Sequence, residues 1–360
     1  MAQIDAFFKL MNEQGASDLH LMSGMPPILR IRGDMEAVKY KVMDNEALKA
    51  MLYEICPEEK IKVFEETGDM DFGYEIPNLA RYRCNFFEQK NGIGAVFREI
   101  PSKILTCDQL LLPSVIGKLS QLPKGMVVVT GPTGSGKSTT LAAIIDEANR
   151  TRKHHILTIE DPIEFVHVPQ KAIINHREVG THTRSFSAAL RGALREDPDI
   201  ILVGEMRDLE TVALAMEAAM TGHLLFATLH TLNASKTVDR MIEIFPYSQQ
   251  EQVRSTLADA LRAVISQTLF KRQDIKGRVA AVEILICTAA VRNLIREGKT
   301  YQIPSAMQTG KKYGMQTLDD AIMDLLKKTW ISPEDAYMYA TEKQKFVGYL
   351  KKPPIDFTEV

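Results

Sequence analysis

Hydrophobic spacing divides the first hundred residues into short helices and strands. Apolar residues recur at helical spacing over 45–55 and over the shorter stretch 7–14. Between these two stretches, residues 19–38 show the apolar and polar alternation of strands, and turn-forming residues interrupt it at 25–27. This mixture of elements predicts an α+β domain over 1–100.

Strand and helix patterns alternate regularly in the middle of the chain. Strands are predicted at 126–130, 155–160, 199–203 and 223–229, and helices at 137–150, 186–195 and 208–220. Parallel strands need crossover connections, which are usually helices, and such sheets are covered on both faces. The alternation therefore predicts an α/β fold built on a parallel sheet.

Helical periodicity dominates beyond residue 247. The stretch 248–270 has apolar residues at helical spacing, an apparent hairpin follows through 266–286, and further helices are predicted near 288–297, 316–328 and 332–340. These last helices predict a helical C-terminal subdomain over about 290–360. Because 101–124 contains prolines and a glycine that favour turns, we interpret it as a linker and 125–360 as the second domain.

Composition and charge narrow the class of protein. Of the 360 residues 45% are hydrophobic, which is typical of a folded globular chain. The 44 basic residues are balanced by 46 acidic ones, so no overall positive field favours nucleic acid as a stable partner. Asp5, Lys9 and Glu13 interrupt the segment where a signal peptide would need an apolar core. We therefore expect a cytoplasmic protein.

A glycine-rich loop gives the strongest chemical signal. Residues 131–138 match the pattern G-x-x-x-x-G-K-[ST] between an apolar strand and a helix, the setting in which such a loop binds nucleoside triphosphate phosphates. The predicted phosphate-binding residues are Gly131, Pro132, Thr133, Gly134, Ser135, Gly136, Lys137, Ser138 and Thr139. Lys137 is expected to reach the β- and γ-phosphates of ATP, and Ser138 to offer its hydroxyl to Mg²⁺.

Carboxylates follow two of the predicted strands. Glu160, Asp161 and Glu164 end the first, and Glu205 ends the second, where Gly204 stands in place of the usual metal-binding aspartate. In parallel sheets such strand ends lie beside the bound phosphates. The predicted Mg²⁺ ligands are Ser138, Glu160 and Glu205. Helix capping is the alternative interpretation of the first cluster.

Two histidines bracket another predicted strand. His230 follows its carboxyl end, where a γ-phosphate is expected, and His223 begins it. A role in sensing phosphate is therefore predicted for His230, and position alone gives a weaker case for His223. The alternative is that both histidines are structural.

Arginines gather on one predicted hairpin of the first domain. With Asn91 and Gly92 as its two loop residues, Asn85 pairs with Arg98. The register places Arg81, Arg83 and Arg98 on one face of the sheet, and Tyr82, Cys84, Phe86 and Phe97 on the other. Like charges on one face repel each other, so nucleotide phosphates contributed by another chain or domain are the predicted partner. A solvated basic face is the alternative.

Four motifs identify a family resemblance. GPTGSGKSTT, TIEDPIEF, DPDIILVGEMRD and TGHLLFATLHT follow one another in the order and spacing of the bacterial type II/IV secretion ATPases. The segments 16–20 and 290–297 further resemble the pilus retraction ATPases within that family. The resemblance implies a PAS-like N-terminal domain, a RecA-like P-loop core and a homohexameric ring. It also implies hydrolysis of ATP with Mg²⁺, coupled to an inner-membrane pilus platform protein.

The same resemblance assigns roles to residues. It implies catalytic carboxylates, histidine-box residues and interfacial arginines at Glu164, Glu205, His223, His230, Arg81, Arg83 and Arg98. It links Arg292, Asn293 and Arg296 to pilus retraction, on an exposed basic ridge of a helix. The alternatives are a pilus assembly or type II secretion ATPase, an accessory retraction ATPase, a nucleic-acid translocase and a nucleotide-regulated scaffold. Assembly ATPases typically carry a C-x-x-C zinc module, which this sequence lacks.

Overall fold

The computed structural model describes residues 2–31, 33–77, 79–100 and 103–352, which form two compact units. Unit 1 comprises Met1–Lys103 with Pro162–Val166, and unit 2 comprises Ile104–Asp161 with the chain from His167 onward. Residues 101–102, where the linker was predicted to begin, and 353–360, at the end of the predicted helical subdomain, lie outside the described residues.

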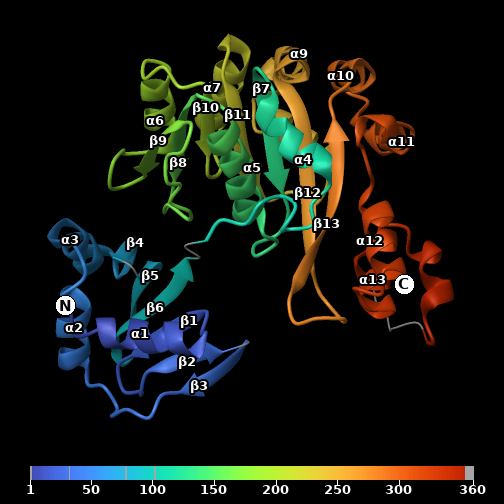
Figure 1. Cartoon of the computed structure of the whole chain (residues 1–360). Helices are drawn as coiled ribbons and strands as arrows, with labels where there is room; N and C mark the ends of the chain where they lie inside the picture. Colours follow the sequence, from blue (N-terminus) through green and yellow to red (C-terminus); the bar gives the residue numbers. More distant parts are fainter. Residues whose placement is uncertain (1, 32, 78, 101–102, 353–360) are drawn as a thin grey trace. The chain divides into compact units, whose positions relative to one another are not determined.

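Unit 1 is an α+β fold around one antiparallel sheet (Figure 1). Its strands lie in the order β3 (Asp34–Ala37), β2 (Ile28–Ile31), β1 (Asp18–Met22), β6 (Gly92–Ile100), β5 (Ala80–Gln89) and β4 (Asp69–Ile76). Its helices are α1 (Asp5–Gln14), α2 (Asn45–Tyr53) and α3 (Glu58–Thr67). Tyr82, Cys84 and Phe86 alternate along β5 into the core and are fully buried, as is Phe97 on β6. The predicted inward face of this hairpin is confirmed.

The register of the hairpin differs from the prediction by two residues. Lys90 and Asn91 form the loop, Gly92 pairs with Gln89, and Arg98 faces Arg83 rather than Asn85. Gly92 adopts φ 113°, and the Asn45 side chain lies where a β-carbon on residue 92 would stand. The Asn45 Oδ1 atom accepts a hydrogen bond from the Ile93 N–H at 2.8 Å, a contact with α2 that the local sequence does not reveal. A shift of two residues leaves each side chain on its predicted face.

Unit 2 contains a seven-stranded sheet whose central strands are hydrophobic throughout. The order is β13 (Arg278–Ile286), β12 (Leu261–Lys271), β7 (Gly125–Thr130), β11 (Leu224–Leu229), β10 (Ile200–Val203), β8 (His155–Glu160) and β9 (Ile173–Glu178). Only the β12–β13 pair is antiparallel. Every residue of β7, β10 and β11 is buried, as expected for strands covered on both faces. The predicted α/β core is confirmed.

Helices cover both faces of this sheet (Figure 1). The helices of the core are α4 (Ser114–Lys118), α5 (Lys137–Thr151), α6 (Phe186–Ala193), α7 (Leu209–Thr221), α8 (Ala234–Glu243) and α9 (Gln250–Ala260). Val127 and Val129 of β7 pack towards α4 and α5, whereas Met126 and Val128 pack towards α6, α7 and α9. The alternation of side chains along β7 thus joins two hydrophobic layers.

The prediction of one helix over 248–270 is wrong in its second half. Helix α9 ends at Ala260, and β12 begins at Leu261. The apolar residues of this stretch are compatible with either element, and tertiary pairing decides between them. The run Ala263–Ile265 is buried between β7 and β13, which both bond to it.

Three of the C-terminal helices begin at side-chain caps. Helices α10 (Ala289–Arg296), α12 (Leu318–Lys327) and α13 (Pro333–Tyr339) start after Thr288, Thr317 and Ser332, whose hydroxyls accept backbone N–H groups, and α11 spans Ile303–Thr309. Helices α12 and α13 pack on the far end of the β12–β13 hairpin through a separate apolar cluster. Within the described residues, none of the helices has the length and apolar character needed to cross a bilayer.

Candidate nucleotide-binding site

The glycine-rich loop connects β7 to α5 at the carboxyl edge of the parallel sheet. Gly131, Gly134 and Gly136 have φ values of 137°, 77° and 88°, which residues with side chains rarely adopt. A β-carbon on Gly131 would also stand 2.4 Å from the Gln267 carbonyl oxygen. The loop therefore needs glycine to curl, and its backbone N–H groups precede the amino end of α5.

Lys137 is held inside the loop. Its Nζ atom donates to the carbonyl oxygens of Gly131 at 2.9 Å and Pro132 at 3.2 Å, and lies 3.4 Å from the His230 Nδ1 atom. The side chain is buried and reaches from the first turn of α5 towards the end of β11. The ammonium group of Lys137 therefore lies where a phosphate group would bind in a loop of this kind.

His230 connects the lysine to Glu205. The Nε2 atom of His230 lies 3.0 Å from Glu205 Oε1, and Arg207 Nη2 lies 2.7 Å from Glu205 Oε2. Because an ammonium group can only donate, His230 accepts at Nδ1 and donates its Nε2–H to the carboxylate. The chain Lys137–His230–Glu205–Arg207 therefore joins the loop to the ends of β10 and β11.

The surroundings of Glu205 favour its ionised form. Partial burial opposes ionisation, but the hydrogen bond and charge of Arg207, together with His230, hold the pKa of Glu205 below its ordinary value. An ionised carboxylate is an acceptor only, so it can orient a water molecule or bind a cation. Sequence reasoning did not single out Arg207, although it lies two residues after Glu205.

The geometry explains why residue 204 is glycine. A β-carbon at Gly204 would stand 3.3 Å from the Glu160 Cα atom and 3.3 Å from the Ile159 carbonyl oxygen. Both are backbone atoms of the neighbouring strand β8, which leaves little room for an aspartate. Glu160 itself is buried at the end of β8, so it lies at the same sheet edge as Glu205.

His223 lies at the opposite edge of the sheet from His230. It precedes β11, its carbonyl oxygen accepts the N–H of Gly125 at the start of β7, and its Nδ1 atom lies 3.0 Å from the Ala218 carbonyl oxygen. The strand between the two histidines spans about 20 Å at the usual rise per residue. The structure therefore does not bring His223 to the loop of its own chain.

The predicted arginines and Glu164 belong to unit 1. Arg81 faces Glu75 at 3.4 Å, Arg83 faces Asp71 at 3.6 Å, and Arg98 faces Asp18 at 2.8 Å. The shared face of the three arginines is confirmed. Each has an acidic neighbour, which weakens the argument from their mutual repulsion, and binding of nucleotide phosphates by these arginines stays a prediction. Glu164 lies in the short segment Pro162–Val166.

The late motif on α10 is more tightly packed than a solvated ridge. Val291 and Ile295 are fully buried. Arg296 pairs with Asp259 on α9, and the Arg292 Nε atom is buried with no hydrogen-bond partner among the residues that the structure describes. The prediction of two exposed arginines is therefore wrong for the inner part of Arg292. Both arginines contribute to the contact between α10 and its surroundings.

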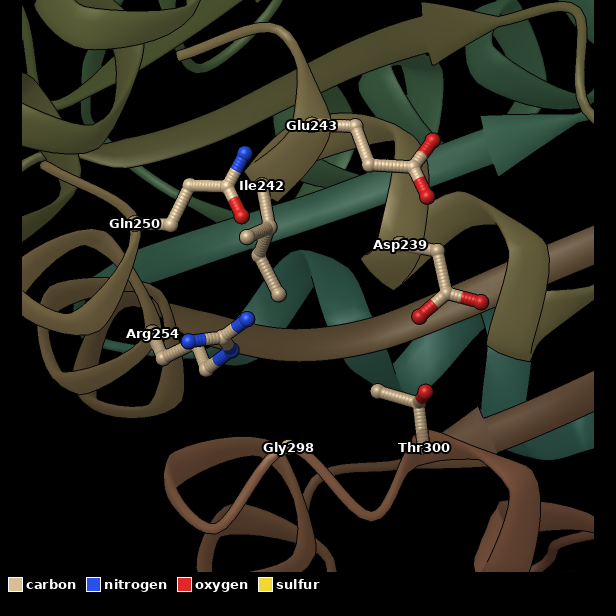
Figure 2. A pocket seen from close by; sticks show the side chains of 7 residues that line it. All are labelled: Asp239, Ile242, Glu243, Gln250, Arg254, Gly298 and Thr300. Atoms are coloured by element: carbon tan, nitrogen blue, oxygen red, sulfur yellow. The ribbon is translucent and has the colours of Figure 1, made fainter. Parts of the chain in front are cut away.

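A cavity of about 110 Å³ lies between α8, α9 and the turn that follows α10. Figure 2 shows Asp239 and Arg254 pointing towards one another across it. It is lined by Asp239, Ile242, Glu243, Gln250, Arg254, Gly298 and Thr300, none of which is a predicted site residue.

Comparisons with known proteins agree with one family. The family model described as "Type II/IV secretion system protein" matches residues 111–328. The chain is 54% identical over 334 residues to the type IV pilus retraction ATPase PilT of Pseudomonas aeruginosa, covering 93% of this chain and 97% of the relative. It is 53% identical to a twitching motility protein of Neisseria gonorrhoeae, covering 86% of this chain and 83% of the relative.

A solved structure agrees with the fold. The crystal structure of the pilus retraction motor PilT with bound ADP superimposes with a TM-score of 0.88 at 44% identity, covering 96% of this chain and 98% of that chain.

Proposed function

The chain belongs to the type II/IV secretion ATPase family, and from this membership we propose that it hydrolyses ATP to power retraction of a type IV pilus. The observation that carries the enzymatic part of the proposal is the chain Lys137–His230–Glu205 at the carboxyl edge of the sheet. The identity to a retraction ATPase over almost the whole length of both chains supports the same assignment.

The residues of the site divide the chemistry between them. The loop N–H groups and Lys137 bind the phosphates, and Lys137 exchanges its bonds to Gly131 and Pro132 for phosphate oxygens. Glu205 orients the attacking water. His230 contacts both Lys137 and Glu205, so a movement of Lys137 towards the phosphates changes the position of Glu205. Hydrolysis then releases phosphate, and the loop can return to the state in which the lysine is bonded to its own carbonyls.

Mg²⁺ is part of the proposal, and the donor atoms fit it. Ser138 offers a hydroxyl beside the loop, and Glu160 and Glu205 offer carboxylates at the same sheet edge. Within the described residues no three histidine, cysteine or acidic side chains are grouped to hold a metal ion. In nucleotide sites Mg²⁺ usually keeps several waters and is bound by one or two carboxylates together with substrate phosphates. Bound there, Mg²⁺ neutralises charge on the phosphates.

Completion of the site by neighbouring chains is also proposed. We infer a homohexamer in which Arg81, Arg83 and Arg98 exchange their acidic neighbours for the phosphates of an adjacent subunit. Glu164 is proposed to assist catalysis, and His223 to act at a subunit boundary. The PAS-like and RecA-like names for 1–100 and 125–360, the linker 101–124 and the helical subdomain from about 290 belong to the same proposal.

The proposed partner is a pilus platform protein of the inner membrane, reached from the cytoplasm. Phosphate release by the purified chain, with and without DNA, tests the enzymatic part. We expect turnover that needs Mg²⁺ and does not respond to DNA. Stimulation by single-stranded DNA would favour a nucleic-acid translocase, and no turnover would favour a nucleotide-regulated scaffold. The rate at which pili shorten or grow in cells distinguishes retraction from assembly.

A further inference from the structure

Gln267 contacts the phosphate-binding loop at both of its ends. The pairing of β12 with β7 reaches Ser266 and Thr130, so Gln267 lies beside the first residue of the loop. Its carbonyl oxygen stands 2.4 Å from the position of a β-carbon on Gly131. Its side chain crosses beneath the loop and donates from Nε2 to the Ser135 carbonyl oxygen at 2.5 Å. One residue of a neighbouring strand therefore contacts the loop near its first residue and near its end.

The orientation of the Gln267 amide is fixed by its partner. A carbonyl oxygen only accepts hydrogen bonds, so the amide atom next to Ser135 must be nitrogen. The same Nε2 atom stands 3.1 Å from the position of a β-carbon on Gly136, which adopts φ 88°. The amide thus supports the turn directly before the lysine of the loop.

Two buried polar atoms at this contact have no hydrogen-bond partner among the residues that the structure describes. They are the Oε1 atom of Gln267 and the hydroxyl of Ser135, in side chains that are 2% and 3% exposed. One can only accept and the other can donate, and their residues already touch. Buried groups of this kind are normally paired. The Ser135 hydroxyl and Gln267 Oε1 can therefore form one further hydrogen bond, with the hydroxyl as donor.

We propose that Gln267 is a positioning residue for the nucleotide, and this proposal rests on the proposed ATP site. Its amide N–H holds the Ser135 carbonyl so that the N–H groups at the end of the loop face the phosphates. When phosphate enters, the loop shifts so that the Ser135 hydroxyl donates to Gln267 Oε1. That bond pairs both buried atoms and links nucleotide binding to β12.

Variants of the full-length protein test this role through KM, kcat and the Kd of ADP. Gln267→Met keeps the length of the side chain but cannot bond, and we expect KM and the ADP Kd to rise about tenfold while kcat changes less than about threefold. Ser135→Ala should weaken ADP binding by a smaller factor. Because the proposed bond joins these two side chains when nucleotide is bound, adding Ser135→Ala to Gln267→Met should cost nothing further.

Ser266→Ala is the matched control. It removes a buried hydrogen bond of 2.9 Å to the Thr130 hydroxyl, between the same two strands, without touching the loop. We expect ADP binding like that of the unmodified chain. Equal losses in Gln267→Met and Ser266→Ala would overturn the proposal in favour of general support of the sheet. Fully additive effects of Gln267→Met and Ser135→Ala would overturn the shared bond.

The pH dependence of KM in Gln267→Glu distinguishes a positioning role from a purely structural one. Its protonated form can donate to the Ser135 carbonyl oxygen, whereas its ionised form repels it. The KM ratio of this variant to the unmodified chain should therefore rise between about pH 6 and about pH 8. A ratio of one at every pH would overturn the proposal. Absence of turnover in the unmodified chain would instead contradict the proposed function.

Discussion

Substituting Gly204 tests whether packing excludes the usual aspartate from this site. A β-carbon there meets two backbone atoms of β8 at 3.3 Å, the Glu160 Cα and the Ile159 carbonyl oxygen. Such overpacking costs about 1–3 kcal/mol. Replacing glycine by alanine recovers about 0.4–1 kcal/mol by restricting the unfolded chain. We therefore expect Gly204→Ala to lose up to about 2.6 kcal/mol, with a middle value of about 1.3 kcal/mol, or about 4 °C in Tm for a domain of this size.

Gly204→Asp adds a carboxylate beside Glu160, which is itself buried. A buried polar group without a partner costs about 1–3 kcal/mol more, so the aspartate variant should melt lower than the alanine variant. Gly348→Ala is the control, because a β-carbon there meets nothing within 4 Å. Only the restriction of the unfolded chain remains at that position, so the Tm of Gly348→Ala should rise slightly rather than fall. Thermal unfolding followed by circular dichroism measures all three.

Two results would refute the reasoning about Gly204. Gly204→Ala and Gly204→Asp could have the same Tm as the unmodified chain, which would show that there is room for a side chain at residue 204. Alternatively, Gly204→Asp could hydrolyse ATP faster with Mg²⁺, which would show that an aspartate there is a better metal ligand than the present arrangement.

Three further predictions follow from the site, a buried histidine and the late motif. Lys137→Ala should abolish ADP binding in calorimetry, whereas Glu205→Ala should retain it and lose about 10²–10⁴-fold in phosphate release, and loss of binding in both would make Glu205 structural. Burial, with a smaller effect of a neighbouring histidine, lowers the pKa of His167 from 6.5 to about 4. The unfolded chain therefore binds the proton more tightly, and the stability gained from neutral His167 is complete above pH 6.5. The free energy of unfolding therefore falls by about 3 kcal/mol as the pH is lowered towards 4. Denaturant unfolding at several pH values should show this loss in the unmodified chain and not in His167→Gln. Replacing Arg292 and Arg296 by alanine should leave the proposed hexamer and part of its ATPase activity intact but stop retraction, and normal retraction in cells would contradict a role for this motif.

The sequence predicts the architecture well where local pattern and tertiary pairing agree. The buried strands β7, β10 and β11 are apolar throughout, and their boundaries lie within one residue of those predicted. The stretch after Ala260 is different, because its side chains suit a helix or a buried strand equally. Pairing with β7 and β13 makes this stretch a strand, and β7 lies more than 100 residues earlier in the sequence.

The candidate site was predictable only in its motif residues. The spacing places Lys137, Glu205 and His230 at one sheet edge, and the structure brings their side chains together. Gln267 could not be found, because a single polar residue in a strand gives no signal of what lies beside it. The acidic neighbour of Arg98 was missed for a related reason, because Asp18 lies 80 residues from it in the sequence.

The rate at which single pili shorten in living cells tests the central claim most directly. The chain is expressed in cells that retain their assembly ATPase but lack their own retraction ATPase, and pili are followed by fluorescence. We predict that the unmodified chain restores shortening, whereas Glu205→Ala at equal abundance does not. Pili that never shorten with the unmodified chain, or pilus growth restored in cells lacking the assembly ATPase, would contradict the assignment as a retraction motor.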